Sequence, residues 1–511
     1  MKAIRLQRFK GFIDSGWIEM KPITLLFGYN SSGKSSILHA LLMLKQSLEN
    51  PSLEVPFVFS SKRGVDLGSF EDTVYNHEIN HEDPMIISLK IDIGETLTRV
   101  KPKGMLLKPE GYRDFTLEDT VVEYSMEISY NKKRRFITII GFAIKDSNDK
   151  IILKMKRANP SQNAKNSFTS EYFKELNKNN NNMKIDWYNF LPVIKDPDFY
   201  NHPIAEVVEA LRLETILSFN KLFNIGPVRA VPERNQPFTG ESPVNVGAQG
   251  EEAFKLLYLD KYRNDSKGLE TKVNDWLARY HYKFEWQIFR NSLGRFILTD
   301  TRSKVKVSIK DVGFGLSQIL PIVIQIFDTD SNSTVLVEQP EIHLHPSAQA
   351  DLADLFIEAV YKKKNDSIGT YSKQNLVIET HSEHLLLRLR RRLAESYLRK
   401  KIDGKQQDIK NLEAKSLIEK ELLIRFKEER LNLPLNDFEE QFNIGDIAIY
   451  FIENIEGKSI ANKLELSEKG ELLNNSPSFR HFFTDDFEEV FRINNLLANI
   501  KKENEEVVVK K

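Results

Sequence analysis

Two patterns of hydrophobic and polar positions run along this chain. Unbroken apolar runs that end in polar residues lie at 22–27, 334–338, 375–380 and 447–453. Such runs are typical of strands buried on both faces, as in a parallel sheet covered by helices. Segments 121–128 and 136–140 instead alternate apolar and polar residues, which indicates an antiparallel sheet with one wet face. Helical periodicity follows the first run at 37–45, so the sequence predicts an α/β fold with an antiparallel β lobe.

Length, charge and cysteine content narrow the class of protein. A chain of 511 residues is expected to form two or three compact units. The 73 Lys and Arg balance 73 Asp and Glu, so no overall basic field indicates nucleic acid, although a local basic face stays open. The absence of cysteine excludes disulfides, cysteine-based zinc sites and thiol catalysis. Because neither a secretory leader nor a membrane-length apolar run is recognisable, the sequence predicts a cytoplasmic protein without a membrane segment.

A complete phosphate-binding motif, G-x-x-x-x-G-K-[ST], follows the first apolar run. It spans residues 28–35 and opens the predicted helix, which is the strand–loop–helix context that the motif requires. Backbone N–H groups of the loop would bind polyphosphate, Lys34 the outer phosphates, and the Ser35 hydroxyl a magnesium ion. The predicted nucleotide-binding residues of this loop are Asn30, Ser31, Ser32, Gly33, Lys34, Ser35 and Ser36. The sequence therefore predicts a nucleoside triphosphate site, with ATP and Mg²⁺ as cofactors.

Three motifs in the second half of the chain fit such a site. The second apolar run ends in Glu338, which would hold the magnesium beside Ser35, as the acid of a Walker B strand does. The third run leads to His381, which a neighbouring parallel strand would bring to the γ-phosphate. A glycine-rich turn at 310–318 forms another anion-binding helix terminus, although a plain turn before a core helix is the commoner explanation.

Two further features have competing interpretations. His343 and His345 have the spacing of a metal-binding pair, but Pro346 and the helix that follows favour a structured turn over a transition-metal site. Lys10 lies one short hairpin from the phosphates, where it either contacts the nucleotide or is an exposed turn lysine. The residues alone leave the role of Lys10 open.

The order of these motifs resembles the ABC/SMC-type ATPases, the branch that includes RecF-like repair proteins and the OLD family. The segments E-Q-P-E-I-H-L-H-P at 338–346 and E-T-H-S-E at 379–383 are most similar to bacterial AAA-15/AAA-21 ATPases with a C-terminal domain of unknown function. The resemblance covers about 1–92 and 220–390, and more weakly 445–492, without the acidic metal cluster of a Toprim nuclease. It implies an ABC-type P-loop ATPase head: a mixed or parallel sheet with flanking helices, an antiparallel β lobe and a helical insertion.

In that superfamily two heads sandwich two nucleotides, so the resemblance implies a homodimer or a larger even-numbered oligomer. The signature that caps the γ-phosphate of the partner subunit would consist of Gly313, Gly315 and Ser317. The resemblance also makes His381 the switch histidine, places residues 343–345 at the D-loop position, and makes Lys10 the basic residue near the nucleotide.

One departure from the family pattern concerns catalysis. The pattern has an Asp for magnesium followed by a catalytic Glu, and Glu338 and Gln339 occupy these two positions. Gln can orient a water but cannot accept its proton. Either Glu341 supplies the carboxylate, or hydrolysis is slow and the protein acts mainly as an ATP-held clamp. The predicted catalytic residues of this slow, regulated ATPase are Glu338, Gln339, Glu341 and His381.

The C-terminal part of the chain is rich in charge. Arg388, Arg391 and Arg392 lie off the apolar stripe of a predicted helix, where a solvated face is the default and contact with DNA or RNA phosphates the alternative. The predicted units are the first part of the ATPase head at 1–92, a β-rich and helical insert at 93–220, the second part of the head at 221–390, a charged helical insertion at 391–445, and a C-terminal strand and cap at 446–500.

The leading functional hypothesis is an ATP-binding and hydrolysing switch that dimerises through sandwiched ATP. It would control a co-encoded effector such as a nuclease in bacterial anti-phage defence, a setting that comes from the resemblance alone. The alternative is a RecF-like DNA-repair or chromosome clamp, which would bind DNA in an ATP-dependent and salt-sensitive way. The missing Toprim region disfavours a nuclease activity of the chain itself.

Overall fold

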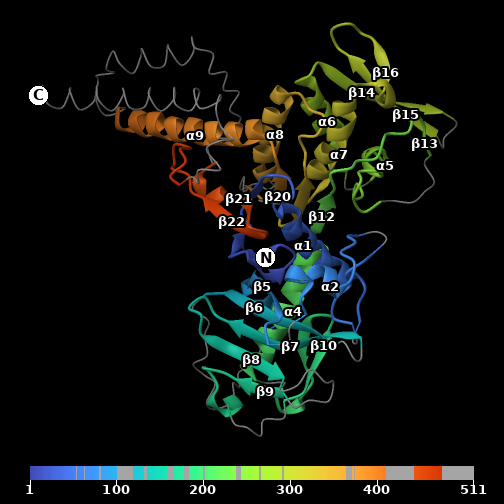
Figure 1. The fold of residues 1–511 in the computed structure, drawn as a ribbon. Coiled ribbons are helices and arrows are strands. Elements are labelled where there is room, and N and C mark those ends of the chain that lie inside the picture. Colours follow the sequence, from blue (N-terminus) through green and yellow to red (C-terminus); the bar gives the residue numbers. More distant parts are fainter. Residues whose placement is uncertain are drawn as a thin grey trace, which may run out of the picture.

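A six-stranded sheet forms the centre of the protein in a computed structural model (Figure 1). Its strand order is β12-β17-β20-β4-β21-β22, and all neighbours are parallel except β21 and β22. These strands are β12 (Leu222–Ile225), β17 (Thr334–Glu338), β20 (Asn375–Thr380), β4 (Ile23–Gly28), β21 (Ile447–Ile455) and β22 (Lys458–Leu464). The four apolar runs of the sequence are therefore four adjacent strands of one sheet, as their pattern predicts.

The structure describes most of the chain. The described residues are 1–52, 55–61, 64–79, 82–100, 119–131, 135–157, 166–177, 183–199, 202–237, 243–263, 266–289, 293–363, 371–372, 374–409 and 442–474. The predicted terminal cap and most of the predicted charged insertion lie outside the described residues.

Helices cover both faces of the central sheet and divide the core in two. One face packs against α1 (Lys34–Glu49) and α4 (Pro203–Asn220), and the other against α5 (Ala253–Asp260), α6 (Leu269–Ala278), α7 (Phe314–Asp328), α8 (Pro346–Val360) and α9 (Glu383–Ile409). Alternate residues of β4 belong to different cores, with Leu26 on the first face and Leu25 and Phe27 on the second. Covering both faces explains why these strands are apolar throughout.

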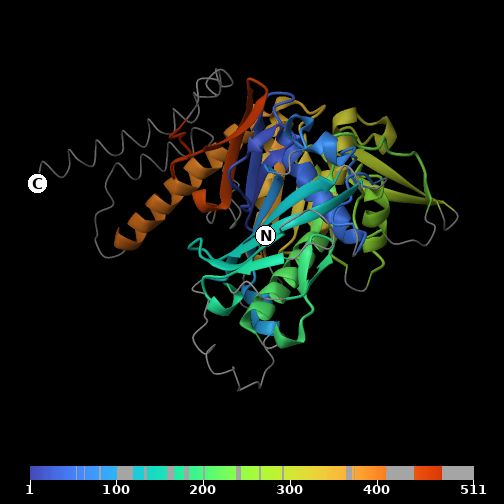
Figure 2. The same ribbon diagram turned by 60° about the horizontal axis from the view of Figure 1, so that its bottom comes forward.

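A second, antiparallel sheet forms the lobe at the bottom of Figure 1, which comes forward in Figure 2. Its strands are β1 (Ala3–Phe9), β2 (Phe12–Asp14), β3 (Ile18–Glu19), β5 (Met85–Asp92), β6 (Val121–Asn131), β7 (Phe136–Lys145), β8 (Ile151–Arg157) and β9 (Asn166–Thr169). Shorter elements of this region are α2 (Phe70–Thr73), α3 (Gly94–Val100), β10 (Ile185–Tyr188) and β11 (Leu191–Ile194). Because β5 pairs with both β1 and β6, the sheet joins the two segments that the sequence analysis assigned to units 1–92 and 93–220.

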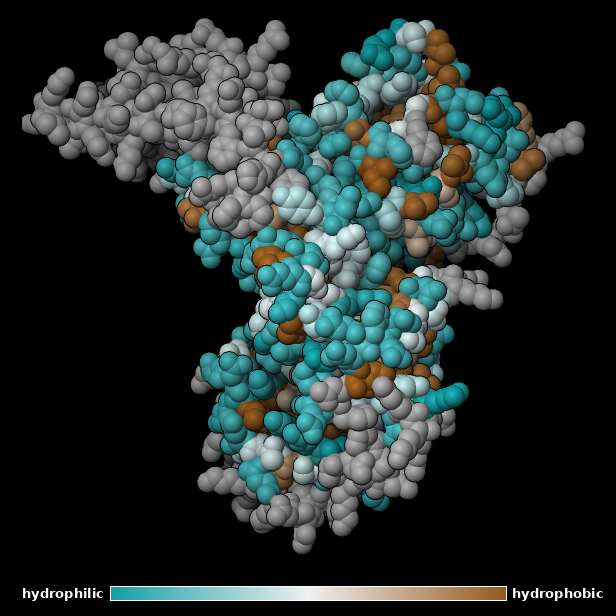
Figure 3. Space-filling model, in the orientation of Figure 1, coloured by the Kyte–Doolittle hydropathy of each residue, from teal (hydrophilic) through white to brown (hydrophobic). Residues whose placement is uncertain are grey.

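A small antiparallel lobe, which the sequence analysis did not predict, lies over α5–α7. It contains β13 (Gln236–Pro237), β14 (Tyr282–Phe289), β15 (Leu293–Asp300) and β16 (Lys306–Ser308), and a short ladder elsewhere joins β18 (Lys362–Lys363) to β19 (Tyr371–Ser372). Phe284 and Phe296 stack with ring centroids 4.6 Å apart and pack against Phe254 of α5. The surface seen in Figure 3 is mostly polar, with small apolar patches over this lobe.

Helix α9 is a single element across the predicted boundary at 390, and ion pairs join it to α8. Arg388 Nη1 lies 2.6 Å from Asp354 Oδ2, and Arg392 Nε lies 2.7 Å from Asp354 Oδ1. Arg391 and Arg392 also pair with Glu395, one turn along α9. The guanidinium groups of Arg388 and Arg392 therefore hold the two helices together. This corrects the interpretation of these two arginines as a solvated or phosphate-binding face, because Asp354 comes from a helix that the local pattern could not place beside them. Arg391 pairs within α9, and contact with phosphates stays a prediction for it.

Candidate functional site

The phosphate-binding loop between β4 and α1 is shaped by two glycines and by the C-terminal hairpin. Gly28 and Gly33 have φ values of 148° and 107°, which side-chain-bearing residues rarely adopt. A Cβ atom on Gly28 would lie 2.0 Å from the Ile452 carbonyl oxygen, and one on Gly33 would lie 2.5 Å from Ser459 Oγ. Strand β21 and the start of β22 thus leave room only for glycine, and they fix the loop against the sheet.

The start of α1 has no capping side chain where an anion would bind. Gly33 is the N-cap of this helix, and no side chain caps the terminus. The Ser36 N–H donates to the Gly33 carbonyl at 3.1 Å, and phosphate would displace no capping side chain from the other N–H groups of the first turn. The buried Lys34 ammonium donates to the carbonyls of Gly28 (3.1 Å) and Tyr29 (2.6 Å). Burial lowers the pKa of Lys34, while nearby Glu379 and Glu341 oppose this shift. The predicted residues Asn30 and Ser31 are exposed beside it, and Ser32 is buried.

Ser35 contacts an acid that the sequence analysis did not assign. Its hydroxyl donates to Glu379 Oε1 at 2.9 Å. Strand β20 lies between β4 and β17, and its register pairs Glu379 with Glu338. Glu379 is therefore the acid on the strand next to the loop, and Glu338 lies one strand further away. Glu379 could have been recognised from the sequence, because the apolar runs at 334–338 and 375–380 each have an acid at or next to their carboxyl end, and ligands bind at the carboxyl ends of parallel strands.

Glu338 is buried beside a second acid, Glu379. Burial and the negative charge of Glu379 raise the pKa of Glu338 to about 7, while a hydrogen bond from Asn224 and the charge of Arg229 oppose the shift. His39 of α1 is the nearest ion-pair partner, with Nε2 3.9 Å from Glu338 Oε2. Burial also raises the pKa of Glu379. The site thus concentrates negative charge that a cation would balance.

Ser35, Glu338 and Glu379 fit a magnesium ion. All three offer the hard oxygen atoms that Mg²⁺ prefers. Within the described part of the chain, Glu379 Oε2 is buried and has no hydrogen-bond partner, which is costly unless a ligand satisfies it. No group of three or more acidic, histidine or cysteine side chains in the described ranges forms a metal site by itself.

Glu341 holds the switch segment with both of its carboxylate oxygens. Oε1 accepts the His381 backbone N–H at 2.7 Å, and Oε2 accepts the Thr380 hydroxyl at 2.8 Å. The side chain is buried, and burial raises its pKa in spite of these hydrogen bonds. Its geometry is that of a positioning residue between the turn after β17 and the end of β20.

Replacing Glu341 by Ala is expected to lower the free energy of unfolding by about 3 kcal/mol, because a buried donor and a partly buried donor lose their acceptor. Chemical denaturation followed by circular dichroism would measure the change. The matched variant Glu341→Gln keeps a side chain of the same shape that can accept at least one of these hydrogen bonds, so its loss should be smaller. Equal stability of the wild type and Glu341→Ala would show that the two hydrogen bonds contribute nothing.

Arg229, in the loop after β12, is a second residue that the sequence analysis did not assign. Its Nη2 donates to the carbonyls of Glu338 (2.7 Å) and Gln339 (3.2 Å). Burial lowers its pKa to about 10, although Glu341 and Glu338 favour the charged form. The backbone of Gln339 has φ 45° and its N–H donates to the Glu379 carbonyl at 2.8 Å. Arg229 and β20 together fix the backbone that carries Gln339.

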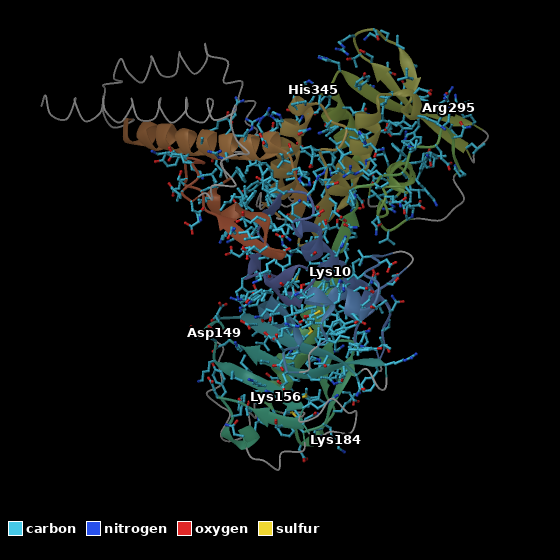
Figure 4. The ribbon with its side chains drawn as sticks, in the orientation of Figure 1. Lys10, Asp149, Lys156, Lys184, Arg295 and His345 are labelled. Carbon is cyan, nitrogen blue, oxygen red and sulfur yellow. The ribbon has the colours of Figure 1, made fainter. Side chains whose placement is uncertain are left out.

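His381 lies beside the phosphate-binding loop, and Lys10 lies in a turn near His39 of α1. The pKa of His381 is lowered by burial and by the charge of Lys34, and its ring is hydrogen-bonded to the backbone of Gly28. Lys10 lies in the β1–β2 turn, where the two large sheets meet (Figure 4). Its ammonium is 3.5 Å from the Leu67 carbonyl, and its charge helps to lower the pKa of His39. The structure therefore brings His381 to the phosphate-binding loop, whereas contact of Lys10 with the nucleotide stays a prediction.

The predicted signature and D-loop lie together at the start of α7. Gly313 is the exposed N-cap of this helix, whereas Ser317 is buried inside the chain. A Cβ atom on Gly315 would lie 2.6 Å from the His343 carbonyl oxygen. His345 caps α8 through Nδ1, which accepts the Ser347 N–H at 3.3 Å, and Figure 4 shows where it lies. This capping role agrees with a structured turn at this position.

The chain is similar to one described protein family and to solved SMC head domains. The sequence profile described as "AAA domain, putative AbiEii toxin, Type IV TA system" matches residues 23–388. None of the curated proteins matches the chain. An SMC head domain from Thermotoga maritima is 8% identical, with 91% of this chain and 99% of that chain covered and a TM-score of 0.36. The Smc head domain from Pyrococcus furiosus, with an extended coiled coil and bound to the C-terminal domain of ScpA, is 10% identical, with 91% and 96% covered and a TM-score of 0.39.

The matched segment contains the phosphate-binding loop, the buried acids and His381, but neither Lys10 nor the C-terminal hairpin that supports the loop. The expected α/β fold with a P-loop ATPase head is confirmed by this match and by the central sheet. In the described ranges, no helix combines the length and the apolar character needed to cross a membrane. Because the profile covers well over half of the 511 residues, the chain belongs to the AAA_21 family of ATPase domains.

Proposed function

We propose that this protein is an ATP-binding and hydrolysing switch whose two heads close around sandwiched ATP and thereby control a partner effector. The observation that carries this proposal is the contact of Ser35 with Glu379 beside a helix terminus that no side chain caps. It combines a phosphate-binding loop, a magnesium-binding hydroxyl and buried acids in one site.

The chain's own residues suggest how the site would work. Lys34 would exchange the carbonyls of Gly28 and Tyr29 for the outer phosphates. Magnesium, when bound by Ser35 and the neighbouring acids, would balance the developing negative charge on the phosphates. His381 is held near Lys34 by Glu341 and would face the γ-phosphate. Gln339 would orient the attacking water without taking its proton, so we expect slow turnover.

The exposed start of α7 supports closure by a second copy. Gly313 and His343 are both exposed, and Gly315 places the first turn of α7 directly against the His343 backbone. A helix N-terminus of this kind can accept the γ-phosphate of a facing subunit. Because Ser317 is buried, Gly313 is the member of the predicted signature that reaches the surface.

The nature of the effector rests on resemblance. The matching family is described as a putative toxin of a Type IV TA system, which supports a setting in which the ATPase acts with a second, co-encoded protein. A nuclease of bacterial anti-phage defence, with both proteins in the cytoplasm, is our proposal for that setting. A DNA clamp receives no support from Arg388, Arg391 and Arg392, which pair with carboxylates.

Light scattering and phosphate release test the proposal together. The wild type should turn over ATP slowly and should gain the mass of a dimer with ATP but not with ADP. Gly313→Glu should leave ATP binding unchanged and weaken dimerisation about tenfold or more, because it places a negative charge where the partner's γ-phosphate would lie. The backbone φ of Gly313 is −48° and a Cβ there meets nothing within 4 Å, so Gly313→Ala is the matched control. A monomer at every nucleotide concentration would contradict the dimer, and ATP-dependent DNA binding would favour the clamp.

A further inference from the structure

The end of β20 carries an acid whose position is central to the site but whose role no family pattern supplies. Glu379 lies on the strand between β17 and β4, paired in register with Glu338 on one side and with Leu26 on the other. Register partners in a parallel sheet project from the same face. The two carboxylates therefore leave the carboxyl edge of the sheet side by side, next to the start of α1.

The contacts of Glu379 are incomplete in a way that points to a cation. Oε1 accepts the Ser35 hydroxyl at 2.9 Å, while Oε2 is buried without a hydrogen-bond partner among the described residues. The whole side chain is 3% exposed. A buried carboxylate oxygen without a donor is costly, and a bound cation removes this cost. The hydroxyl that Glu379 contacts is the one that the phosphate-binding motif assigns to magnesium.

Glu341, another acid close to the loop, has no free carboxylate oxygen to offer a cation. Both of its oxygens are engaged, one by the His381 N–H and one by the Thr380 hydroxyl. Releasing them would free the segment that carries His381. Among Glu338, Glu341 and Glu379, only Glu379 touches Ser35 and keeps a buried oxygen free.

We propose that Glu379 is the second carboxylate of the magnesium site, holding the ion together with Ser35 and Glu338. This inference rests on the proposed function, because it assigns a ligand within the same ATP site. Glu379, on the strand next to the loop, is then essential for magnesium binding. Glu338 shares with it the magnesium-binding role that the family pattern gives to the acid at the end of β17 alone.

The competing explanation is that the Glu379–Ser35 hydrogen bond only ties α1 to β20. Glu379→Gln separates the two, because the Gln side chain can still accept the Ser35 hydroxyl but carries no charge. Glu379→Asp keeps the charge on a shorter side chain and serves if Glu379→Gln fails to fold. Glu453→Gln is the matched control, since Glu453 lies at the end of β21, the other neighbour of β4, and is bonded to Asn462.

Metal binding is measured directly with Mn²⁺, whose free-ion paramagnetic resonance signal disappears on binding. The full chain is titrated in the presence of a non-hydrolysable ATP analogue, and binding of fluorescent ATP in EDTA is measured in parallel. Glu379→Gln should raise the dissociation constant for Mn²⁺ about tenfold or more and leave metal-free nucleotide binding unchanged. The dissociation constant of Glu379→Asp for Mn²⁺ should lie between those of Glu379→Gln and the wild type. That of Glu453→Gln should equal the wild-type value.

The outcomes separate this inference from the proposed function. If the wild type binds Mn²⁺ with nucleotide and Glu379→Gln binds it equally well, the metal role is overturned and the tie between α1 and β20 remains. Slower single-turnover hydrolysis with unchanged Mn²⁺ affinity would also overturn it, because it would make Glu379 a proton acceptor. If the wild type binds neither nucleotide nor Mn²⁺, the proposed ATP site itself fails.

Discussion

Replacing Lys34 by Met is expected to lower kcat/KM for ATP hydrolysis by about 10³-fold, or about 4 kcal/mol. The Lys34 ammonium donates to the carbonyls of Gly28 and Tyr29 inside the loop, where the outer phosphates would bind. Methionine fills a similar volume without charge, so the change removes the interaction with the outer phosphates and leaves the packing. Phosphate release would measure the loss of turnover, and equilibrium binding of fluorescent ATP would measure the loss of affinity.

Lys45→Met is the control for this experiment. Lys45 lies further along the same helix, partly exposed, and pairs with Glu49 rather than with the loop. Its replacement should leave both ATP binding and turnover at the wild-type level. Full activity of Lys34→Met would show that the nucleotide binds elsewhere, and it would remove the basis of the proposed ATPase.

The loop and the central sheet were predictable because their signals are local. A strand buried on both faces is apolar along its whole length, so the four runs that became β17, β20, β4 and β21 could be recognised one at a time. The phosphate-binding motif is likewise a property of consecutive residues, since glycines and a helix terminus make the anion site. His381 could be placed near the phosphates because ligands bind at the carboxyl ends of parallel strands.

The remaining parts of the site depend on which strands become neighbours, and no local pattern states this. Ser35 contacts Glu379 only because β20 inserts between β4 and β17. Gly28 and Gly33 are confined by Ile452 and Ser459, which are more than 400 residues away in the chain. Their contacts become visible only after the sheet has been assembled.

The charged residues of α9 are a second case in which the local pattern does not reveal which elements become neighbours. A helix wheel separates Arg388 and Arg392 from the apolar stripe and so suggests that they face water. In the structure both pair with Asp354 of α8. An arginine placed against a carboxylate of a packed helix can be buried, whereas an unpaired one would be too costly to bury. The sequence pattern shows where the arginines lie on their own helix, but it does not show that Asp354 of α8 lies beside them.

Replacing Gln339 by Glu is expected to raise the rate of single-turnover ATP hydrolysis by about 100-fold, because a positioned general base contributes about 10²–10⁴-fold. The change keeps the shape of the side chain and adds an atom that can accept the proton of the attacking water. Rapid mixing of ATP with an excess of the protein, followed by quantification of phosphate, would measure it. Excess protein keeps product release from hiding the chemical step.

The structure favours this substitution because the backbone of residue 339 is already fixed. Its N–H donates to the Glu379 carbonyl and its carbonyl accepts from Arg229, so the new carboxylate should occupy the place of the amide. The added charge has a cost, since Glu338, Glu341 and Glu379 are buried nearby. We therefore expect Gln339→Glu to be less stable without nucleotide and to depend more strongly on magnesium.

Gln339→Ala distinguishes a gained base from a merely relaxed site. It removes the amide without adding a carboxylate, so its hydrolysis should be slower than that of the wild type. If both variants hydrolyse ATP faster, the native glutamine restrains the site by its size, and the argument from proton acceptance fails. If Gln339→Glu alone is faster, the slow turnover of the native protein follows from the missing proton acceptor. In the proposed dimer, that single amide would then set the time for which ATP holds the two heads together.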